Sequence, residues 1–266
     1  MENFKYGCKK EIKDRRDYKA KLVSSVEFPE EFRLDMPKVK NQGMVNSCVA
    51  HSLSTFLERY FNDDFSVGFI YGYRPEGYSQ DEGMYPREAL KTLQKVGDVK
   101  NNIFDYNEEV PKIIQMVNEK KDYLIDKAQD FKIESYARIY SVNEIKKCIY
   151  SGTPVPISIP IYDGMRLDEN GTILEGKEID GYHMMIACGW DKNGILLQNS
   201  WGKNVGITGF VRLPFFYKID SAWAISMKNN KIETKVPFLT KITKILKKIK
   251  NFLKKYFQKI RRVKKC

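Results

Sequence analysis

The stretch NQGMVNSCVAHSLSTFLERY, residues 41–60, decides how the first half of the chain folds. Its apolar side chains recur at steps of one, three and four residues, the spacing that gathers them on one face of a helix. They are Val49, Leu53, Phe56, Leu57 and Tyr60. Ser47, a residue type favoured at helix N-caps, stands directly before this run. The helix is therefore predicted to begin at Cys48, with the thiol in its first turn.

Beyond this helix the pattern changes from helical to strand-like near residue 130. Helices are predicted over 86–96, which opens on a proline and stops at Gly97, and within 111–129. Short apolar segments separated by glycine, proline or asparagine then predict strands at 133–140, 155–162, 183–190, 195–199, 209–213 and 222–226. One more helix interrupts them, capped by Ser141 with Glu144 three residues later. A helical half followed by a mostly antiparallel β half predicts an α+β fold.

The positive charge of the chain belongs to its C-terminal end. The 266 residues carry a formal net charge of +12, yet residues 231–266 alone hold 14 basic side chains and one acid. The other 230 residues are close to neutral. We therefore predict a body over residues 1–227, a polar linker over 228–238 and a basic amphipathic helix over 239–266.

Three interpretations of this tail stay open. Its apolar residues recur at helical spacing among lysines, which suits a helix lying in an anionic membrane interface through residues 239–265. The same apolar seam would also suit docking on the body. Binding to nucleic acid is the least favoured, because phosphate contacts need no continuous apolar face. No apolar run reaches the ~18 residues of a spanning helix, and the charged N-terminus does not resemble a secretion signal.

The cysteines and histidines are scattered rather than grouped. The five cysteines form no C-x-x-C pair, and the chain has two histidines, His51 and His183. No metal site is expected, and without a phosphate-binding or dinucleotide glycine motif no cofactor is expected either. Unpaired cysteines fit a reducing compartment, so the sequence predicts a cytoplasmic protein, peripheral at a membrane if the tail binds one.

Cys48 is placed for thiolate chemistry, because free N–H groups and the positive dipole end of a helix lower a thiol pKa. His183, at the head of a predicted strand, can exchange the proton, and Asn199 on another strand can orient the imidazole. Gln42 can donate to a developing oxyanion together with the Cys48 N–H. His51 is a second candidate base, less favoured because no orienting partner accompanies it. Each residue alone also has a structural explanation; their joint, ordered occurrence indicates a cysteine nucleophile.

Four motifs carry a resemblance to a known family. They are NQGMVNSCVAH (41–51), DEGMYPREALKTLQKVG (81–97), GYHMMIACGW (181–190) and LQNSWGKNVGITGFVRLP (197–214). In this order they resemble the active-site segments of papain-like cysteine peptidases, over roughly residues 28–226. The resemblance implies two lobes around a cleft: a helical lobe carrying Cys48 and an antiparallel β lobe carrying His183.

The resemblance also implies roles for single residues. Cys48 would be the nucleophile, His183 its proton-transfer partner, Asn199 the orienting group and Gln42 an oxyanion donor. The predicted substrate-binding residues are Gly83 and Met84, through their backbone, with Tyr182, Met184 and Trp201. The tryptophan would also shield the bond between histidine and asparagine from water. The expected activity is endopeptidase cleavage of a protein or peptide through an acyl-enzyme. A peptide ligase using the same site, or a binding protein on a degenerate scaffold, stays open.

Several positions depart from the family pattern. Val45 stands where members often have a disulfide-forming cysteine, and Val49 and Val205 replace common tryptophans. Met84 replaces the second glycine of the substrate motif. Only 47 residues precede Cys48, so control by a long inhibitory prosegment is not expected.

Overall fold

The computed structural model describes residues 5–15, 17–20, 26–74, 82–106 and 109–228. The chain divides into two units, Met1–Asn229 and Asn230–Cys266, and the account below concerns the first. The predicted linker beyond residue 228 and the predicted tail helix lie outside the described residues. Within the described ranges, no helix combines the length and the apolar content that crossing a bilayer requires.

The helical half and the β half are both present, and the α+β prediction is confirmed. The helices are α1 (Cys48–Phe61), α2 (Val67–Gly72), α3 (Pro86–Lys95), α4 (Val110–Glu119), α5 (Lys121–Ala128), the 3-10 turn η1 (Gln129–Phe131) and α6 (Val142–Tyr150). The strands are β1 (Phe32–Arg33), β2 (Ile133–Ile139), β3 (Val155–Tyr162), β4 (Ile179–Asp191), β5 (Gly194–Gln198), β6 (Phe210–Leu213) and β7 (Ser221–Met227). They form one antiparallel sheet in the order β2-β7-β3-β4-β5-β6, and β1 also pairs with β4.

The structure differs from the predicted elements in several places, and the two-residue strand β1 is one that was not predicted. The short helix α2 was not expected from the sequence, because its six residues include two glycines. The single helix expected within 111–129 is two helices, α4 and α5, since the backbone leaves the helical region at Lys120. At α6 the predicted capping box is present, with both the Ser141 and the Glu144 side chains bonded to backbone N–H groups.

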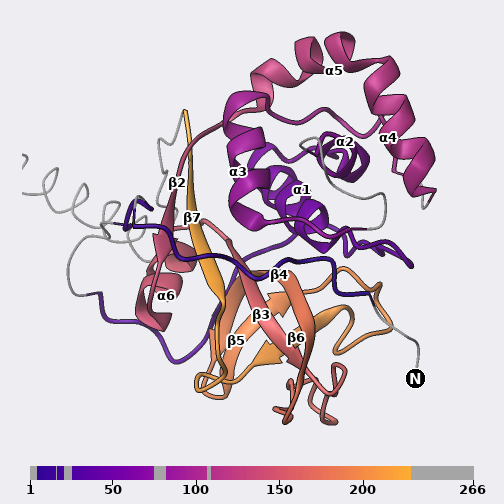
Figure 1. Cartoon of the computed structure of the whole chain (residues 1–266). Helices are drawn as coiled ribbons and strands as arrows, with labels where there is room; N and C mark the ends of the chain where they lie inside the picture. Colours follow the sequence, from indigo (N-terminus) through magenta and orange to yellow (C-terminus); the bar gives the residue numbers. More distant parts are fainter. Residues whose placement is uncertain (1–4, 16, 21–25, 75–81, 107–108, 229–266) are drawn as a thin grey trace, which may run out of the picture. The chain divides into compact units, whose positions relative to one another are not determined.

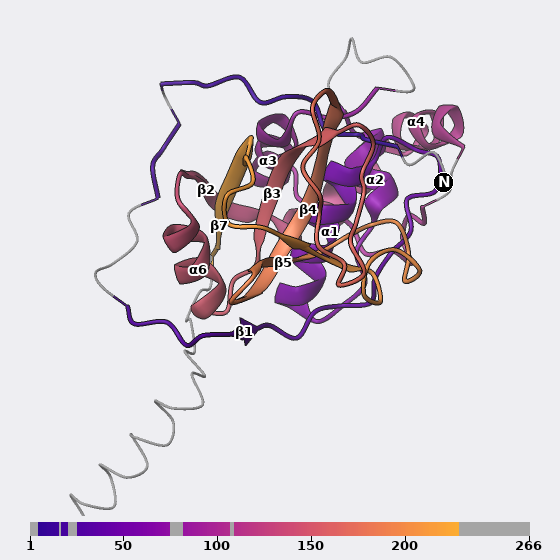
Figure 2. The same ribbon diagram turned by 90° about the horizontal axis from the view of Figure 1, so that it is seen from below.

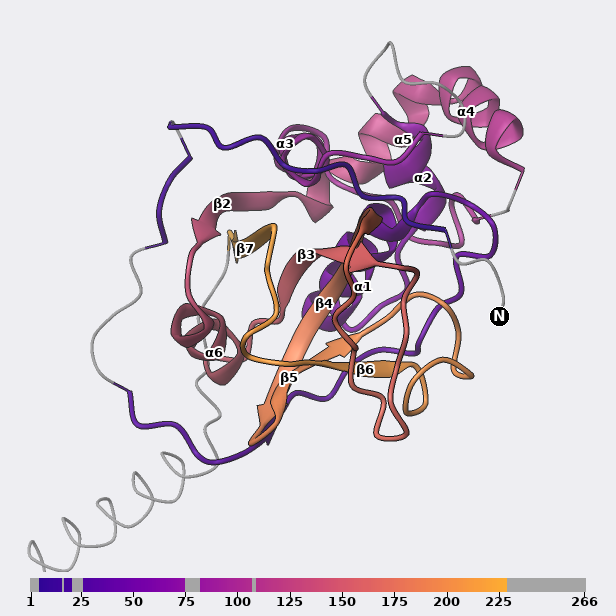
Figure 3. The same cartoon turned by 60° about the horizontal axis from the view of Figure 1, so that its bottom comes forward.

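Helices cover both faces of the sheet. Helix α1 packs against β4, while α4 and α5 lie beyond α2, on the side away from the sheet (Figures 1 and 3). Helix α6 packs against β3, β4 and β7 (Figure 2). Strand β4 therefore packs against the helical lobe through α1 on one face and against α6 on the other.

The side chains of β4 explain why its sequence does not alternate. Met184 and Ile186 belong to the core with α1, whereas Met185 and Ala187 belong to the core with α6. Successive side chains of a strand point to opposite faces, and both faces are covered here. The strand consequently reads as a continuous apolar run. His183 begins this buried run, one residue before the Met184 N–H that contacts Cys48 at the start of α1.

Candidate active site

Cys48 is the first residue of α1 and is fully buried. Its sulfur accepts a hydrogen bond from the Met184 N–H at 3.5 Å, across the boundary between the two lobes. Ser47 occupies the N-cap position as predicted, but its hydroxyl does not cap the helix. The helix start thus lies against β4 at the residue that follows His183.

His183 and Asn199 are paired. The Nε2 atom of His183 lies 2.8 Å from Oδ1 of Asn199, which directly follows β5. Trp201 stacks on the imidazole with ring centroids 4.2 Å apart and planes 21° apart. Because the asparagine oxygen can only accept, the imidazole proton is assigned to Nε2. The Nδ1 atom has no hydrogen-bond partner among the described residues and is left as a proton acceptor.

Gln42 is buried in the loop that precedes α1, with its amide held in one orientation. Its Oε1 accepts from the Ser200 hydroxyl at 2.7 Å, and its Nε2 donates to the Val45 carbonyl at 2.8 Å. The Gln42 backbone N–H donates to the Ser200 carbonyl at 2.8 Å. These bonds tie the loop to the segment between Asn199 and Trp201. The amide nitrogen also donates its second hydrogen to the Lys5 carbonyl at 3.2 Å.

The chain's own N-terminal segment crosses this site. Cys8 donates its N–H to the Tyr182 carbonyl at 3.1 Å, and Lys9 donates to the Met84 carbonyl at 2.9 Å. The Met84 N–H in turn donates to the Gly7 carbonyl at 2.9 Å. The segment, indigo in Figures 1 and 3, runs between the helical lobe and the sheet. It uses the backbone groups that the sequence assigned to substrate.

Two glycines permit this close approach. A Cβ atom on Gly7 would lie 2.1 Å from the backbone of Asn46, and one on Gly83 would lie 2.3 Å from the Gly7 oxygen. The neighbouring Cys8 thiol is buried, 3.1 Å from the Ser158 hydroxyl. A long prosegment was not expected from the sequence. The structure instead covers the site with a few residues of the N-terminal segment, to which the sequence assigned no role.

Burial dominates the ionisation of the site in this closed form. It raises the pKa of Cys48 to about 12, although the N–H groups of Met184 and Gly7 act in the opposite direction. It lowers the pKa of His183 to about 4, opposed by the bond to Asn199. The helix-start argument predicted a lowered thiol pKa. Loss of water around the sulfur outweighs the helix here, so both groups are neutral at pH 7.

The other sequence candidates are placed as follows. Gly83, Met84 and Tyr182 lie against the N-terminal segment, while the Met184 side chain is buried in the core with α1. His51 directs Nδ1 toward Ser47, whose carbonyl oxygen is 3.1 Å away. Burial lowers the pKa of His51 to about 3, and this placement does not favour it as the base. No cluster of three histidine, cysteine or acidic residues suited to a metal occurs in the part of the chain that the structure describes.

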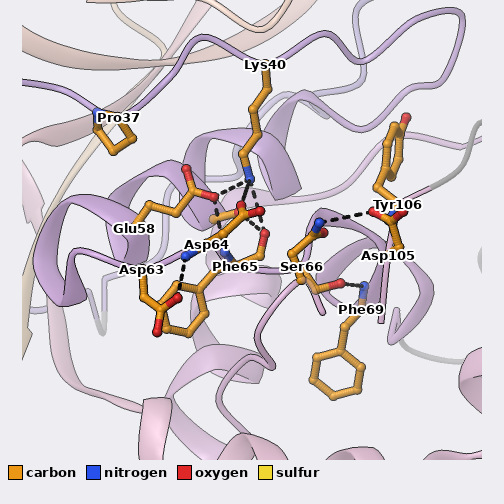
Figure 4. Close-up of polar contacts among 12 residues, drawn as sticks. Pro37, Lys40, Glu58, Asp63, Asp64, Phe65, Ser66, Phe69, Asp105 and Tyr106 are labelled. Atoms are coloured by element: carbon orange, nitrogen blue, oxygen red, sulfur yellow. Dashed lines mark hydrogen bonds and ion pairs between the residues drawn. The ribbon is translucent and has the colours of Figure 1, made fainter. Parts of the chain in front are cut away.

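Sequence reasoning missed Lys40, which anchors the loop that carries Gln42. Its ammonium contacts Glu58 Oε1 at 2.6 Å, the Ser54 hydroxyl at 2.8 Å and the Phe65 carbonyl at 3.1 Å (Figure 4). Glu58 and Ser54 lie on α1, so the loop is tied to the helix that begins at the thiol. A buried glutamate on the apolar side of a predicted helix was the available signal, because such a charge needs a partner.

The comparisons with known proteins agree with this geometry. The family model described as papain family cysteine protease matches residues 75–235, more than half of the chain, including His183 and Asn199 but beginning after Cys48. The "Uncharacterized peptidase C1-like protein L477" of Acanthamoeba polyphaga mimivirus is 19% identical over 202 residues. That match covers 68% of this chain, and the chain spans 65% of the length of the mimivirus protein.

Solved structures are similar over most of the chain. Xylellain, a cysteine protease from Xylella fastidiosa, is 25% identical with a TM-score of 0.74, covering 84% of this chain and 96% of xylellain. Procathepsin B S9 from Trypanosoma congolense, 14% identical with a TM-score of 0.67, covers 84% of this chain and 87% of its own and shows the same fold. With the matched model and these neighbours, the family resemblance is confirmed: the chain belongs to the papain family of cysteine proteases.

Proposed function

We propose that the protein is a cysteine endopeptidase that hydrolyses peptide bonds through an acyl-enzyme on Cys48. The observation that carries this proposal is the 2.8 Å bond between His183 and Asn199, which leaves Nδ1 unprotonated. The next backbone N–H along the strand contacts the Cys48 sulfur. A base with an assigned tautomer therefore lies one residue along the strand from the amide that contacts the thiol, which supports a nucleophile–base–orienter set.

In the proposed reaction, His183 Nδ1 takes the proton of the Cys48 thiol, and the sulfur attacks the carbonyl carbon of the scissile bond. The resulting oxyanion accepts hydrogen bonds from Gln42 Nε2 and the Cys48 N–H. The C–N bond then breaks, and the leaving amine takes the proton from His183. Water attacks the thioester with His183 as base, which releases the carboxylic acid and restores the thiol. Asn199 holds the imidazole in place throughout.

The N-terminal segment supports an extended peptide as the substrate. It bonds to both backbone groups of Met84 and to the Tyr182 carbonyl, as a strand added to a groove does. A substrate can reach these groups only after the segment leaves. We therefore infer that the structure is a closed form, and that its opening precedes catalysis.

The test is cleavage of casein and of a fluorogenic peptide by the full chain, by Cys48→Ala and by Gly7→Leu, which is designed to displace the N-terminal segment. We expect hydrolysis that is faster for Gly7→Leu and absent for Cys48→Ala. A Cys48→Ala protein as active as the parent would overturn the proposal, and inactivity of all three would favour a binding protein. Mass spectrometry with an added amine nucleophile separates hydrolysis from ligation, because a ligase would yield the amide product.

We propose further that residues 239–265 bring the protein to an anionic membrane. The support is the basic amphipathic pattern of the sequence, which places Phe252 and Phe257 among lysines. The test compares pelleting of the full chain with that of a Phe252→Ser, Phe257→Ser variant on phosphatidylserine-containing vesicles. Parent and variant should pellet equally little on neutral vesicles. Equal pelleting on anionic vesicles contradicts the proposal.

A further inference from the structure

The hydroxyl of Tyr106 joins the two ends of the loop that leads to Cys48. It donates to the Gln42 carbonyl at 2.9 Å, and it lies 3.1 Å from the Ser47 hydroxyl. Since the phenol proton goes to a carbonyl that can only accept, the Ser47 hydroxyl is the donor in the second contact. The Tyr106 side chain thus links Gln42 to Ser47, the residue before Cys48.

His51 completes this arrangement from within α1. Its ring meets the Tyr106 ring edge-on, with centroids 5.1 Å apart and planes 86° apart. Its Nδ1 lies 3.1 Å from the Ser47 carbonyl and 3.2 Å from the Ser47 hydroxyl. The carbonyl can only accept, so the proton of the buried, neutral imidazole is assigned to Nδ1. Tyr106, Ser47 and His51, hereafter the loop brace, form a continuous set of hydrogen bonds behind Gln42.

The loop brace adds to the bonds that tie Gln42 to Ser200 on the other side of the loop. A pocket of about 1020 Å³ adjoins the brace, and its lining includes Asn41, His51 and Tyr106. Figure 4 shows Tyr106 beside Asp105, in the same view as the Lys40 contacts. Residues 41–47 include no cysteine that could cross-link the loop. Val45 packs in the core with α1, so the loop is anchored at its middle, and the hydrogen bonds of Tyr106 hold its two ends.

We propose that Tyr106 is a positioning residue, whose hydroxyl holds the Gln42–Ser47 loop so that Gln42 Nε2 and the Cys48 N–H point to one oxyanion. The proposal rests on the proposed function, because it assigns the loop a role in the acyl-transfer steps. An oxyanion donor contributes only when its direction is fixed in advance. Loss of the hydroxyl leaves the thiol, His183 and Asn199 in place.

The test compares Tyr106→Phe with Tyr217→Phe in the full chain, both in the Gly7→Leu background that opens the cleft. Tyr217 is the matched control, because its hydroxyl also donates to one backbone carbonyl, that of Pro160 at 2.9 Å, but in the β lobe. Two rates are measured: hydrolysis of a fluorogenic peptide and alkylation of Cys48 by iodoacetamide. Alkylation occurs at a saturated carbon and forms no oxyanion, so it reports the thiolate alone.

For Tyr106→Phe we expect kcat to fall about tenfold with KM changed less than about twofold, and the alkylation rate to stay at the background value. Tyr217→Phe should leave both rates unchanged. An unchanged kcat for Tyr106→Phe overturns the proposal, and so does an equal fall in alkylation, which would indicate a general structural effect.

Hydrogen exchange keeps the inference testable if the protein hydrolyses nothing. Amides of residues 42–48 should exchange faster in Tyr106→Phe than in Tyr217→Phe, and equal exchange would overturn the proposal. Failure of the proposed function has a different signature, since a Gly7→Leu background without Cys48-dependent hydrolysis contradicts the peptidase activity whatever Tyr106 does.

Discussion

The Lys5 carbonyl oxygen accepts a hydrogen bond from the side-chain amide of Gln42 at 3.2 Å. In the proposed reaction this amide donates to the oxyanion, so a carbonyl of the chain itself occupies the direction that a reacting carbonyl needs. The ring of Tyr6 lies against Trp201 and His183, with centroids 6.0 and 6.4 Å away and planes inclined by 57° and 70°. The N-terminal segment therefore occupies the proposed oxyanion donor, Gln42, and its Tyr6 ring contacts the proposed base, His183.

Replacing Gly7 by leucine should open the site. The added Cβ would lie 2.1 Å from the backbone carbon and oxygen of Asn46. Because the loop that holds Asn46 is tied to Ser200 and Tyr106, we expect the N-terminal segment to move away instead. We expect peptide hydrolysis and iodoacetamide alkylation to rise about tenfold or more, since even a loss of ~1.4 kcal/mol changes a population tenfold. Lys10→Leu, at an exposed position of the same segment, is the control and should not change either rate. Equal rates for Gly7→Leu and the parent would contradict the closed-form inference.

The pH dependence of alkylation should differ between these two forms. Burial raises the pKa of Cys48 to about 12 in the closed form, so very little thiolate exists at pH 7 and the parent should react slowly there. The parent rate should increase only as pH rises into the alkaline range. Opening returns water to the sulfur and lowers its pKa, so Gly7→Leu should react at neutral pH. Identical profiles would show that the segment does not control the thiol.

Replacing Gln42 by alanine should separate acyl transfer from thiol reactivity. Loss of one oxyanion donor lowers kcat by about 100-fold or more in related chemistry. The alkylation rate of Cys48 should stay within about twofold of the Gly7→Leu background in which the variant is made, because no oxyanion forms. Gln115→Ala, an exposed helix position, is the control. Retention of kcat in the Gln42→Ala protein would remove Gln42 from the mechanism.

A double-mutant cycle should expose the coupling between Lys40 and Glu58, whose atoms lie 2.6 Å apart. Lys40→Met leaves a buried carboxyl without its cation and should lower the free energy of unfolding by about 2–4 kcal/mol at pH 8. Lys40→Met combined with Glu58→Gln should lose less, since a glutamine oxygen can still accept from the Phe65 N–H. Urea denaturation measures all four proteins, and additive losses would show that the pair is not coupled.

The stability of the parent should also fall as pH rises toward 7. Burial raises the pKa of Glu58 to about 7, opposed by Lys40, so the folded protein holds this proton more tightly than the unfolded chain. The corresponding stability is complete below about pH 4.3 and is lost as pH approaches 7, by on the order of 1–3 kcal/mol. Glu58→Gln should lack this decline. The free energy of unfolding is measured by urea denaturation at several pH values for the parent and for Glu58→Gln. The difference between the two pH profiles isolates Glu58 from buried Asp98, and parallel profiles would contradict the assignment.

Much of the fold followed from local patterns. The stripe on residues 49–60 predicted α1, and the predicted strands all recur as β2 to β7 with ends shifted by a few residues at most. These elements bury their apolar faces within a layered fold, so periodicity suffices. The local pattern did not predict helix α2 or the break between α4 and α5 at Lys120, because short helices and turns depend on tertiary neighbours that are distant in sequence.

The candidate site was predicted less completely. The sequence named Cys48, His183 and Asn199, and the structure brings the histidine and asparagine into contact and the thiol to the same strand. It did not indicate Lys40 or Tyr106, because their partners are backbone atoms and side chains far along the chain. The role of the tail over 239–266 stays a prediction.

By itself the sequence determined the family, the two halves of the fold and the order of the residues proposed for catalysis, because these depend on residue type and local spacing. Only the tertiary structure decided the state of the site. Whether the Cys48 sulfur at the helix start is exposed to water or buried depends on where Gly7 and its neighbours bind. Burial of charge then sets the thiol pKa, since desolvation outweighs the helix dipole when water is removed.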